Sequence, residues 1–424
     1  GASSFLNYSL GCGPELTFSA TETAGPAGLA TDGDLLGVEC PLAGGRSAMA
    51  LVPYRESDGD TLAVALAERW LLLGSRLVAF AADDDAEWTQ EFQEAMAGVG
   101  PQGLRDLRLV RLGTELSPEA RLALAALAAE NPAVDTLMVA DLAASADLLA
   151  LFRPRQVVLQ DARVADLGRL AGSSTQSLFI AASDGLDFTA LARLPELRSL
   201  VLLDPPPGAL RLPRKGLLLE RLVVRGDGLT GIRHLEAQRD LRYLAVVNLP
   251  PGTVKQVARL PCLEALMVGV AEGEEGAELS ALRALSGLSM LGLQGGVTQT
   301  DFDGLLAANP RLRVVQLVGC GGIADLSAVR WLSELEALVC PGAPLPDATV
   351  LEGLPRLRLL ALASDAFSAE KAESLLGLGE RLPECQVAPV RGFCLGSGWL
   401  LLLVPMVGAA LVARRILEEW RGAL

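Results

Sequence analysis

The sequence repeats a short phrase at a nearly constant interval: a leucine, two variable residues, a second leucine, one variable residue and a third apolar residue. A fixed period in the low twenties is typical of a solenoid, in which each repeat packs only against its neighbours. A chain of this kind normally works by presenting a surface rather than by enclosing a catalytic pocket. The clearest copies of the phrase begin at Leu197, Leu219, Leu241, Leu263, Leu288, Leu312, Leu335 and Leu357.

The phrase continues upstream in a weaker form. A first copy starts at Leu104, and later copies keep two inner apolar positions, as in Leu137 with Val139 and Val157 with Leu159. Because apolar residues at helical spacing separate these copies, each repeat is expected to contain one strand and one short helix. Residues 104–385 are therefore predicted to form the solenoid. Its helices are expected at 117–129, 254–260, 279–285, 301–308 and 326–332.

The stretch from Ile323 to Leu335, IADLSAVRWLSEL, resembles the repeats of about 22 residues in bacterial leucine-rich repeat proteins of the internalin type. The resemblance implies an α/β solenoid with a parallel sheet on the concave face and short helices on the convex face. The chain departs from this family at the ninth position of the repeat, where the family normally has asparagine. That position holds Pro205, Asp227, Leu249, Ala271, Gly296, Cys320, Ala343 and Asp365, so the turns must satisfy their backbone groups in another way.

The region before the repeats divides into two parts. Residues 1–45 are rich in turn formers and are expected to be an irregular leader or short β structure. Residues 46–103 alternate strand and helix patterns, with helices expected at 61–73 and 87–96. This part is either a small α/β domain or the N-terminal cap that a solenoid needs over its open end, and we favour the cap.

The C-terminal region contains 21 consecutive uncharged residues, 393–413, which is long enough to cross a bilayer as a helix. Arg414 and Arg415 follow this segment directly, whereas only Arg391 lies just before it. By the positive-inside rule the tail at 414–424 is then cytoplasmic and the N-terminal domain extracytoplasmic. The prediction is a single-pass cell-membrane protein with a juxtamembrane linker at 386–392. A buried C-terminal helix that seals the solenoid is the alternative.

Charge and cysteine content narrow the range of partners. The formal net charge of −15 argues against nucleic acid as a partner, because an acidic surface repels phosphate backbones.

None of the seven cysteines forms a CxxC pair, so the sequence predicts no metal site. In an extracytoplasmic protein, Cys12 and Cys40 would form a disulfide that staples the leader. Cys320 and Cys340 are expected to be small buried residues of the solenoid.

Catalysis finds little support in the sequence. His234 is the single histidine, and it lies in a segment with helical pattern and no nucleophile motif nearby. The acidic runs at 58–60 and 83–87 follow expected strands, where a cation or an α/β active site would lie, but solvated loops explain them better. The chain is therefore predicted to be no enzyme and to carry no cofactor.

The candidate binding site follows from the alternation of side chains along a strand. The leucines of the phrase point inward, so the third, fifth and seventh residues of each repeat point out onto the concave sheet. These positions are mostly apolar, and an exposed apolar strip marks an interaction surface for a protein partner or another part of the chain. The alternative is that an alanine- and valine-rich composition merely fills the positions. The candidate residues, called the concave strip below, are Val201, Leu203, Arg221, Val223, Arg225, Tyr243, Val247, Met267, Met290, Gln294, Gln316 and Val318.

The functional hypothesis is a non-catalytic protein-binding or scaffolding subunit, held close to the membrane as an accessory component of a membrane protein complex. Gly396, Gly398 and Gly408 in the expected span would allow another membrane helix to approach closely. The alternative hypothesis is an enzyme or ligand-binding protein whose site lies in the N-terminal α/β region, with the repeats as a platform.

Overall fold

The computed structural model describes the greater part of the repeats and several strands before them. The described residues are 4–10, 16–22, 34–42, 46–54, 66–67, 70–73, 76–82, 109–112, 116, 118–130, 134, 136–163, 167–181, 186–215, 217–226, 228–250, 252–270, 279–340, 348–363, 381–382 and 385–390. For the strands before residue 83 only the backbone is described. These residues divide into two compact units, one up to residue 163 with 173–175, and one of 167–172 and 176–390.

The first unit begins with a four-stranded sheet in the order β2-β1-β3-β4. Strand β1 pairs antiparallel with β2 and parallel with β3, and β3 pairs antiparallel with β4. Three of these strands lie within the first 45 residues, where the sequence predicted irregular or short β structure. The strands are β1 (Ser4–Leu10), β2 (Leu16–Glu22), β3 (Asp34–Leu42) and β4 (Arg46–Tyr54).

The later strands of the first unit change from antiparallel to parallel pairing. Strands β5 to β7 pair antiparallel, and β7 to β10 pair parallel. Strands β5 and β6 fall where a helix was expected over 61–73, because a short apolar run fits either period. The helix expected at 87–96 lies outside the described residues. The strands are β5 (Leu66–Ala67), β6 (Trp70–Leu73), β7 (Arg76–Ala82), β8 (Leu109–Leu112), β9 (Thr136–Asp141) and β10 (Gln156–Arg163).

The first copy of the repeat phrase starts three residues later than the sequence predicted. Val110 of β8 pairs in register with Leu137 of β9, and Leu112 pairs with Val139. The phrase therefore begins at residue 107 instead of Leu104. Val110 and Leu112 are both fully buried, so burial of the inner rows decides the register.

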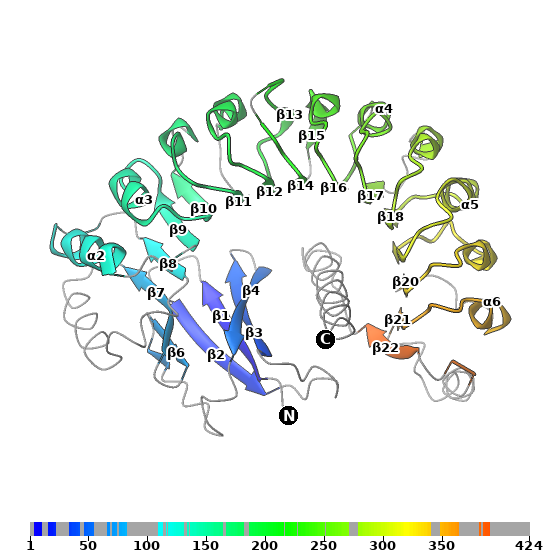
Figure 1. Ribbon diagram of the computed structural model, residues 1–424, viewed down its shortest axis with the longest axis horizontal. Helices are drawn as coiled ribbons and strands as arrows, with labels where there is room; N and C mark the ends of the chain where they lie inside the picture. The colour runs from blue at the N-terminus through cyan, green and yellow to red at the C-terminus, as the bar shows by residue number, and fades with distance from the viewer. Residues whose placement is uncertain are drawn as a thin grey trace, which may run out of the picture. The chain divides into compact units, whose positions relative to one another are not determined.

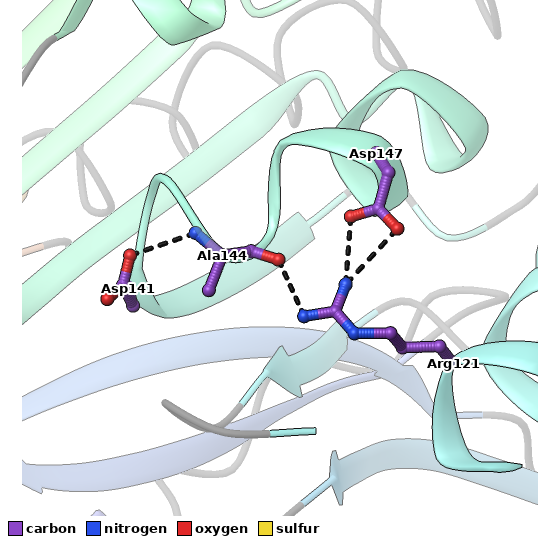
Figure 2. A network of polar contacts seen from close by, with 4 residues as sticks. All are labelled: Arg121, Asp141, Ala144 and Asp147. Carbon is purple, nitrogen blue, oxygen red and sulfur yellow. Dashed lines mark hydrogen bonds and ion pairs between the residues drawn. The ribbon is translucent and has the colours of Figure 1, made fainter. Parts of the chain in front are cut away.

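Helices α2 (Pro118–Glu130) and α3 (Ala146–Phe152) are joined by one arginine (Figure 2). The Nη1 atom of Arg121 lies 3.0 and 3.1 Å from the two carboxylate oxygens of Asp147, and Nη2 donates to the carbonyl oxygen of Ala144 at 2.8 Å. Asp141 accepts a hydrogen bond from the Ala144 amide at 2.9 Å. The two guanidinium nitrogens thus hold the start of α3 against α2 within this unit.

The second unit contains one parallel strand per repeat, as predicted, but its last strand, β22 (Gln386–Val390), falls where the sequence predicted a juxtamembrane linker. Successive strands pair with equivalent positions of the phrase opposite one another; Leu200, Leu222 and Leu244 form one such row. The strands are β11 (Ser177–Ala181), β12 (Ser199–Leu203), β14 (Arg221–Arg225), β16 (Tyr243–Val247), β17 (Ala265–Val270), β18 (Met290–Gly295), β19 (Val314–Val318), β20 (Ala337–Cys340), β21 (Leu359–Ala363) and β22 (Gln386–Val390).

Short helices lie on one side of these strands, and several are 3-10 helices (Figure 1). Those at 253–257, 279–284, 299–308 and 327–331 overlap the predicted helices, whereas the sequence predicted no bounds for the other four. A 3-10 helix rises about 2 Å per residue against 1.5 Å for an α-helix, so it spans a repeat with fewer residues. The helices are η3 (Leu167–Leu170), η4 (Phe188–Arg193), η5 (Leu235–Ala237), α4 (Thr253–Val257), η6 (Leu279–Ala284), α5 (Gln299–Ala308), η7 (Ser327–Trp331) and α6 (Ala348–Glu352).

The core of the second unit consists of stacked rows of the phrase residues. Leu197, Leu200, Leu219, Leu222 and Leu241 are all 0% exposed. Full burial of one leucine side chain stabilises a fold by roughly 1.5–3 kcal/mol, so the rows supply most of the cohesion between repeats. The predicted buried cysteines belong to this core, with Cys320 and Cys340 exposed by 0% and 1%.

Four of the turns after the strands enter the left-handed region at the eighth position of the repeat. Asp204, Asn248, Gly295 and Gly319 have φ angles of 49°, 59°, 76° and 61°. Glycine, asparagine and aspartate enter this region at the lowest cost. At one of these turns the ninth residue, Leu249, donates its backbone N–H to the carbonyl oxygen of Gly269 in the next repeat.

The edge of the sheet where each strand begins carries a ladder of alternating charge. In successive repeats the backbone N–H groups of the second and third residues donate to the carbonyl oxygen of the second residue in the preceding repeat. Arg242 and Tyr243, for example, both donate to the carbonyl oxygen of Glu220. Side chains at the second position then face each other as ion pairs. The pairs are Arg198–Glu220 at 3.5 Å, Arg242–Glu264 at 3.1 Å and Arg313–Glu336 at 2.6 Å.

The predicted membrane span and the predicted disulfide also involve residues that the structure does not describe in full. The expected membrane span at 393–413 lies outside the described residues, and so does Cys12; for Cys40 in β3 only the backbone is described. Among the helices of the described residues, none is both long enough and apolar enough to span a bilayer.

Buried Asn309 joins two repeats, and its removal is expected to loosen them. Its Oδ1 accepts from the Leu288 amide at 3.2 Å, and its Nδ2 donates to the carbonyl oxygen of Leu305 at 3.0 Å. Replacing Asn309 by leucine leaves both backbone groups unpaired, so we expect a loss of about 2 kcal/mol in the free energy of unfolding. Urea unfolding measures this loss. The exposed Arg311→Ala is the control, and an equal loss in both variants would contradict the role of Asn309.

Cysteine reactivity tests the stacked core. Burial raises the pKa of Cys320 to about 11 and that of Cys340 to about 12, from an ordinary value of 9.0. At pH 8 both thiols then stay protonated and react slowly, whereas exposed Cys262 is alkylated quickly. Any stability that depends on the neutral thiols is complete below pH 9 and is lost as pH rises through 11 and 12. Residue-resolved mass spectrometry after iodoacetamide treatment measures the rates; equal rates would refute this packing.

Candidate protein-binding site

The twelve residues of the concave strip lie on six neighbouring strands, β12, β14, β16, β17, β18 and β19. The parallel register places equivalent positions opposite one another, so that Val201, Val223 and Ala245 form one row with Met267. Side chains alternate along each strand, so the leucines next to each strip residue lie on the opposite face of the sheet, toward the helices. The structure therefore gathers all predicted site residues on one face of one sheet.

The strip is less exposed than the sequence predicted. Six of the twelve residues are buried and the other six are half-buried, so none has the exposure expected of a free apolar surface. The central row is the most enclosed, with Val223 3%, Met267 8% and Gln316 0% exposed.

Side chains of the strip pack along the sheet, and this packing accounts for part of the burial. The guanidinium carbon of Arg221 lies 4.9 Å from the centre of the Tyr243 ring, and the Tyr243 hydroxyl donates to the sulfur of Met267 at 3.3 Å. The Met267 side chain occupies the place of a side chain at Gly292, since a Cβ there would lie 2.8 Å from its Cγ. Arginine, tyrosine and methionine thus form a run across four strands.

Arg221 carries a charge that the described residues do not compensate. Its Nε and Nη2 atoms are buried, and neither has a hydrogen-bond acceptor in the described part of the chain. Burial lowers the pKa of this guanidinium, and Tyr243 opposes the shift. Burial also raises the pKa of the Tyr243 hydroxyl to about 12, so the ring stays neutral. An arginine keeps its charge at neutral pH even so, and the two buried donors without acceptors are costly although the guanidinium lies over the Tyr243 ring.

Gln316 is the second polar group of the strip without a partner. Both its amide nitrogen and its amide oxygen are buried, and neither forms a hydrogen bond among the described residues. Each unsatisfied buried group costs roughly 1–3 kcal/mol. Sequence reasoning found both residues, but it could not find that they lack partners, because that depends on every neighbouring side chain.

The other sequence candidates do not form a site in the described residues. His234 lies in the left-handed region with φ 65°, just before η5, and not in the longer helix that the sequence suggested. Within the described ranges, no three side chains of histidine, cysteine, aspartate or glutamate gather as metal ligands would. The acidic runs at 58–60 and 83–87 lie outside the described residues.

Comparison with known proteins gives similarity of structure only. No protein-family model matches the chain, and no curated protein matches it in sequence. An internalin (inlF) from Listeria monocytogenes is 18% identical, with 75% of this chain and 87% of that chain covered and a TM-score of 0.40. A leucine-rich repeat protein of Leptospira interrogans is 14% identical, with 69% and 92% covered and a TM-score of 0.36.

A third similar structure is a complex of TLR13 with ssRNA13. It is 16% identical, 74% of this chain is covered, and the TM-score is 0.45. The match spans 47% of that chain, about half its length. The function of the present chain is therefore argued from its own residues.

Removing the unpaired amide is expected to stabilise the free protein. In Gln316→Leu an apolar group of similar size replaces two unsatisfied polar atoms, so the free energy of unfolding should rise by about 1–2 kcal/mol. Urea unfolding of the purified chain measures the change, with Gln294→Leu on the adjacent strand as a control of equal chemistry. A clear loss of stability in Gln316→Leu would mean that the amide has a structural role.

Proposed function

We propose that the repeat unit is a non-catalytic recognition module that binds a protein partner through the concave strip. The observation that carries this proposal is the pair of polar groups without hydrogen-bond partners, Arg221 and Gln316, on a mainly apolar face. A sheet that served only as scaffold would be more stable with apolar side chains at both positions. A partner that offers hydrogen bonds to both groups would recover their desolvation cost on binding.

The chemistry of the strip defines what such a partner must offer. Arg221 needs a carboxylate or several carbonyl oxygens, and Gln316 needs one donor and one acceptor. The surface between them is apolar and contains Tyr243 and Met267. Tyrosine and arginine are the residue types most often found at the energetic centre of protein interfaces.

Binding requires the strip to open locally, because Gln316 is enclosed. Met267 lies beside Gly292, which pairs in register with Gln316 on the next strand. Methionine has three rotatable bonds and repacks at low cost, so it is the side chain best suited to move aside. The partner would then fill the space over Gly292.

The cellular setting is proposed from the sequence. The uncharged segment 393–413 would anchor the chain in the cell membrane, and the solenoid ends only a few residues before it. The partner would then be a component of a membrane protein complex, of which this chain is an accessory subunit with its repeats outside the cytoplasm.

Charge introduced into the strip should abolish binding of the partner. Tyr243→Asp combined with Met267→Asp places two carboxylates in the apolar centre, so we expect at least about a hundredfold loss of affinity. The measurement is purification of the full chain from its native membrane in mild detergent, with quantitative mass spectrometry of co-purifying proteins. Circular dichroism establishes that the variant is folded.

A matched pair of substitutions controls for added charge. Leu218 and Trp331 are large apolar residues that are 48% and 50% exposed, and neither belongs to the strip. Leu218→Asp combined with Trp331→Asp should retain the partner at the wild-type level. A folded Tyr243→Asp, Met267→Asp protein that still retains its partner would rule out the concave strip as the binding surface.

A further inference from the structure

Two repeats of the second unit carry an additional small parallel sheet of two strands, β13 (Gly208–Arg211) and β15 (Leu229–Arg233). It lies on the helix side of strands β12, β14 and β16, away from the concave strip (Figure 1). Leu210 and Ile232 are buried beneath it at 3% and 1% exposure. Alternation along the strands then turns Arg211 and Arg233 outward.

Like charges face each other across this sheet. Arg211 and Arg233 are paired in register on adjacent strands, about 4.8 Å apart along the sheet, and both are exposed. Arg214 and Lys215 follow β13 directly and are exposed as well. Among the described residues, none of these four cations forms an ion pair with a carboxylate. Like charges directly opposite each other destabilise a sheet, so the arrangement is a cost to the fold.

The cations are held in place by a buried amide. Gln238, which is 2% exposed, donates through Nε2 to the carbonyl oxygen of Pro213 at 2.7 Å and to that of His234 at 3.3 Å. These carbonyl groups lie next to Arg214 and Arg233 in the chain. Gln238 therefore ties together the two segments that carry the charges.

His234 joins the same cluster through its side chain. The Nε atom of Arg214 donates to Nε2 of His234 at 3.4 Å. His234 adopts a left-handed backbone conformation, which is unfavourable for a residue other than glycine. The Gln238 hydrogen bond to the His234 carbonyl oxygen helps to hold this conformation, and with it the arrangement of basic side chains.

We propose that Arg211, Arg214, Lys215 and Arg233 form a binding site for a ligand with phosphate groups. A phosphate group offers up to two negative charges and three acceptor oxygens, and guanidinium groups bind such oxygens in pairs. A single carboxylate would neutralise only one of the four cations. The site is a local exception in a chain of net charge −15, which would otherwise repel phosphates. It is independent of the protein-binding role of the concave strip.

The test uses the full chain in uncharged detergent micelles and two kinds of phosphate. One probe is tripolyphosphate, and the other is dioctanoyl phosphatidylglycerol, with dioctanoyl phosphatidylcholine as the zwitterionic control. Isothermal titration calorimetry at low salt measures the dissociation constants. Binding should weaken as salt is raised, because the contacts are exposed charges.

Paired substitutions separate the site from net charge. Arg211→Gln with Arg233→Gln should weaken binding about tenfold or more, since two charged contacts are lost. Arg259→Gln with Arg311→Gln removes two exposed arginines elsewhere in the same unit and should change the affinity by less than about twofold. Gln238→Leu keeps every cation but removes the clamp, so a several-fold loss with a folded protein would mark Gln238 as a positioning residue.

The outcomes divide clearly. Binding of tripolyphosphate alone identifies a soluble phosphate ligand, and binding of phosphatidylglycerol alone identifies a lipid headgroup. Either result supports the site if the first pair of substitutions weakens binding about tenfold or more. The proposal is overturned if neither probe binds, or if the two paired variants weaken binding equally. Retention of the protein partner by the Arg211→Gln, Arg233→Gln chain is expected in every case, so failure here leaves the concave strip unaffected.

Discussion

Everything in the second unit depends on one constraint: the buried leucine rows must stay in register from strand to strand. A slip of one residue would turn these rows toward solvent and the strip residues into the core. Register is also held by the repeated backbone bonds at the second and third positions and by ion pairs such as Arg313–Glu336. Since each repeat contacts only its neighbours, this local agreement is what makes a long continuous surface possible.

In so regular a structure, the buried polar groups that lack hydrogen-bond partners and the like charges that face each other need an explanation. Arg221 and Gln316 lack hydrogen-bond partners on a mainly apolar face, and Arg211 and Arg233 face each other on a small sheet. Local departures of this kind cost stability and are expected at functional sites. In the roles proposed above, the first pair would receive hydrogen bonds from a partner surface, whereas the second would bind an anion. The two proposed surfaces lie on opposite sides of the repeats.

The sequence predicted the solenoid because the phrase reports which side chains are buried, and burial fixes a strand. It misplaced the first copy at Leu104, because two starts three residues apart both fit the phrase there and only pairing with β9 selects the later one. It did not predict the left-handed backbone at Asp204 and Asn248, because the family pattern concerns the ninth position of the repeat and these residues occupy the eighth. It placed the strip residues on one sheet face, but their burial and the missing partners of Gln316 depend on neighbours in space. The strands β13 and β15 were missed because each offers only one buried side chain.

The central claim is that the concave strip contacts a protein partner in the native membrane. A photo-reactive benzoylphenylalanine at Tyr243 tests it directly, with the same group at exposed Trp331 as the comparison. After illumination of native membranes, mass spectrometry should detect one abundant cross-linked protein with the probe at position 243. The same protein should not be cross-linked by the probe at position 331. Adducts of equal amount from both positions, or none from Tyr243, would contradict the account.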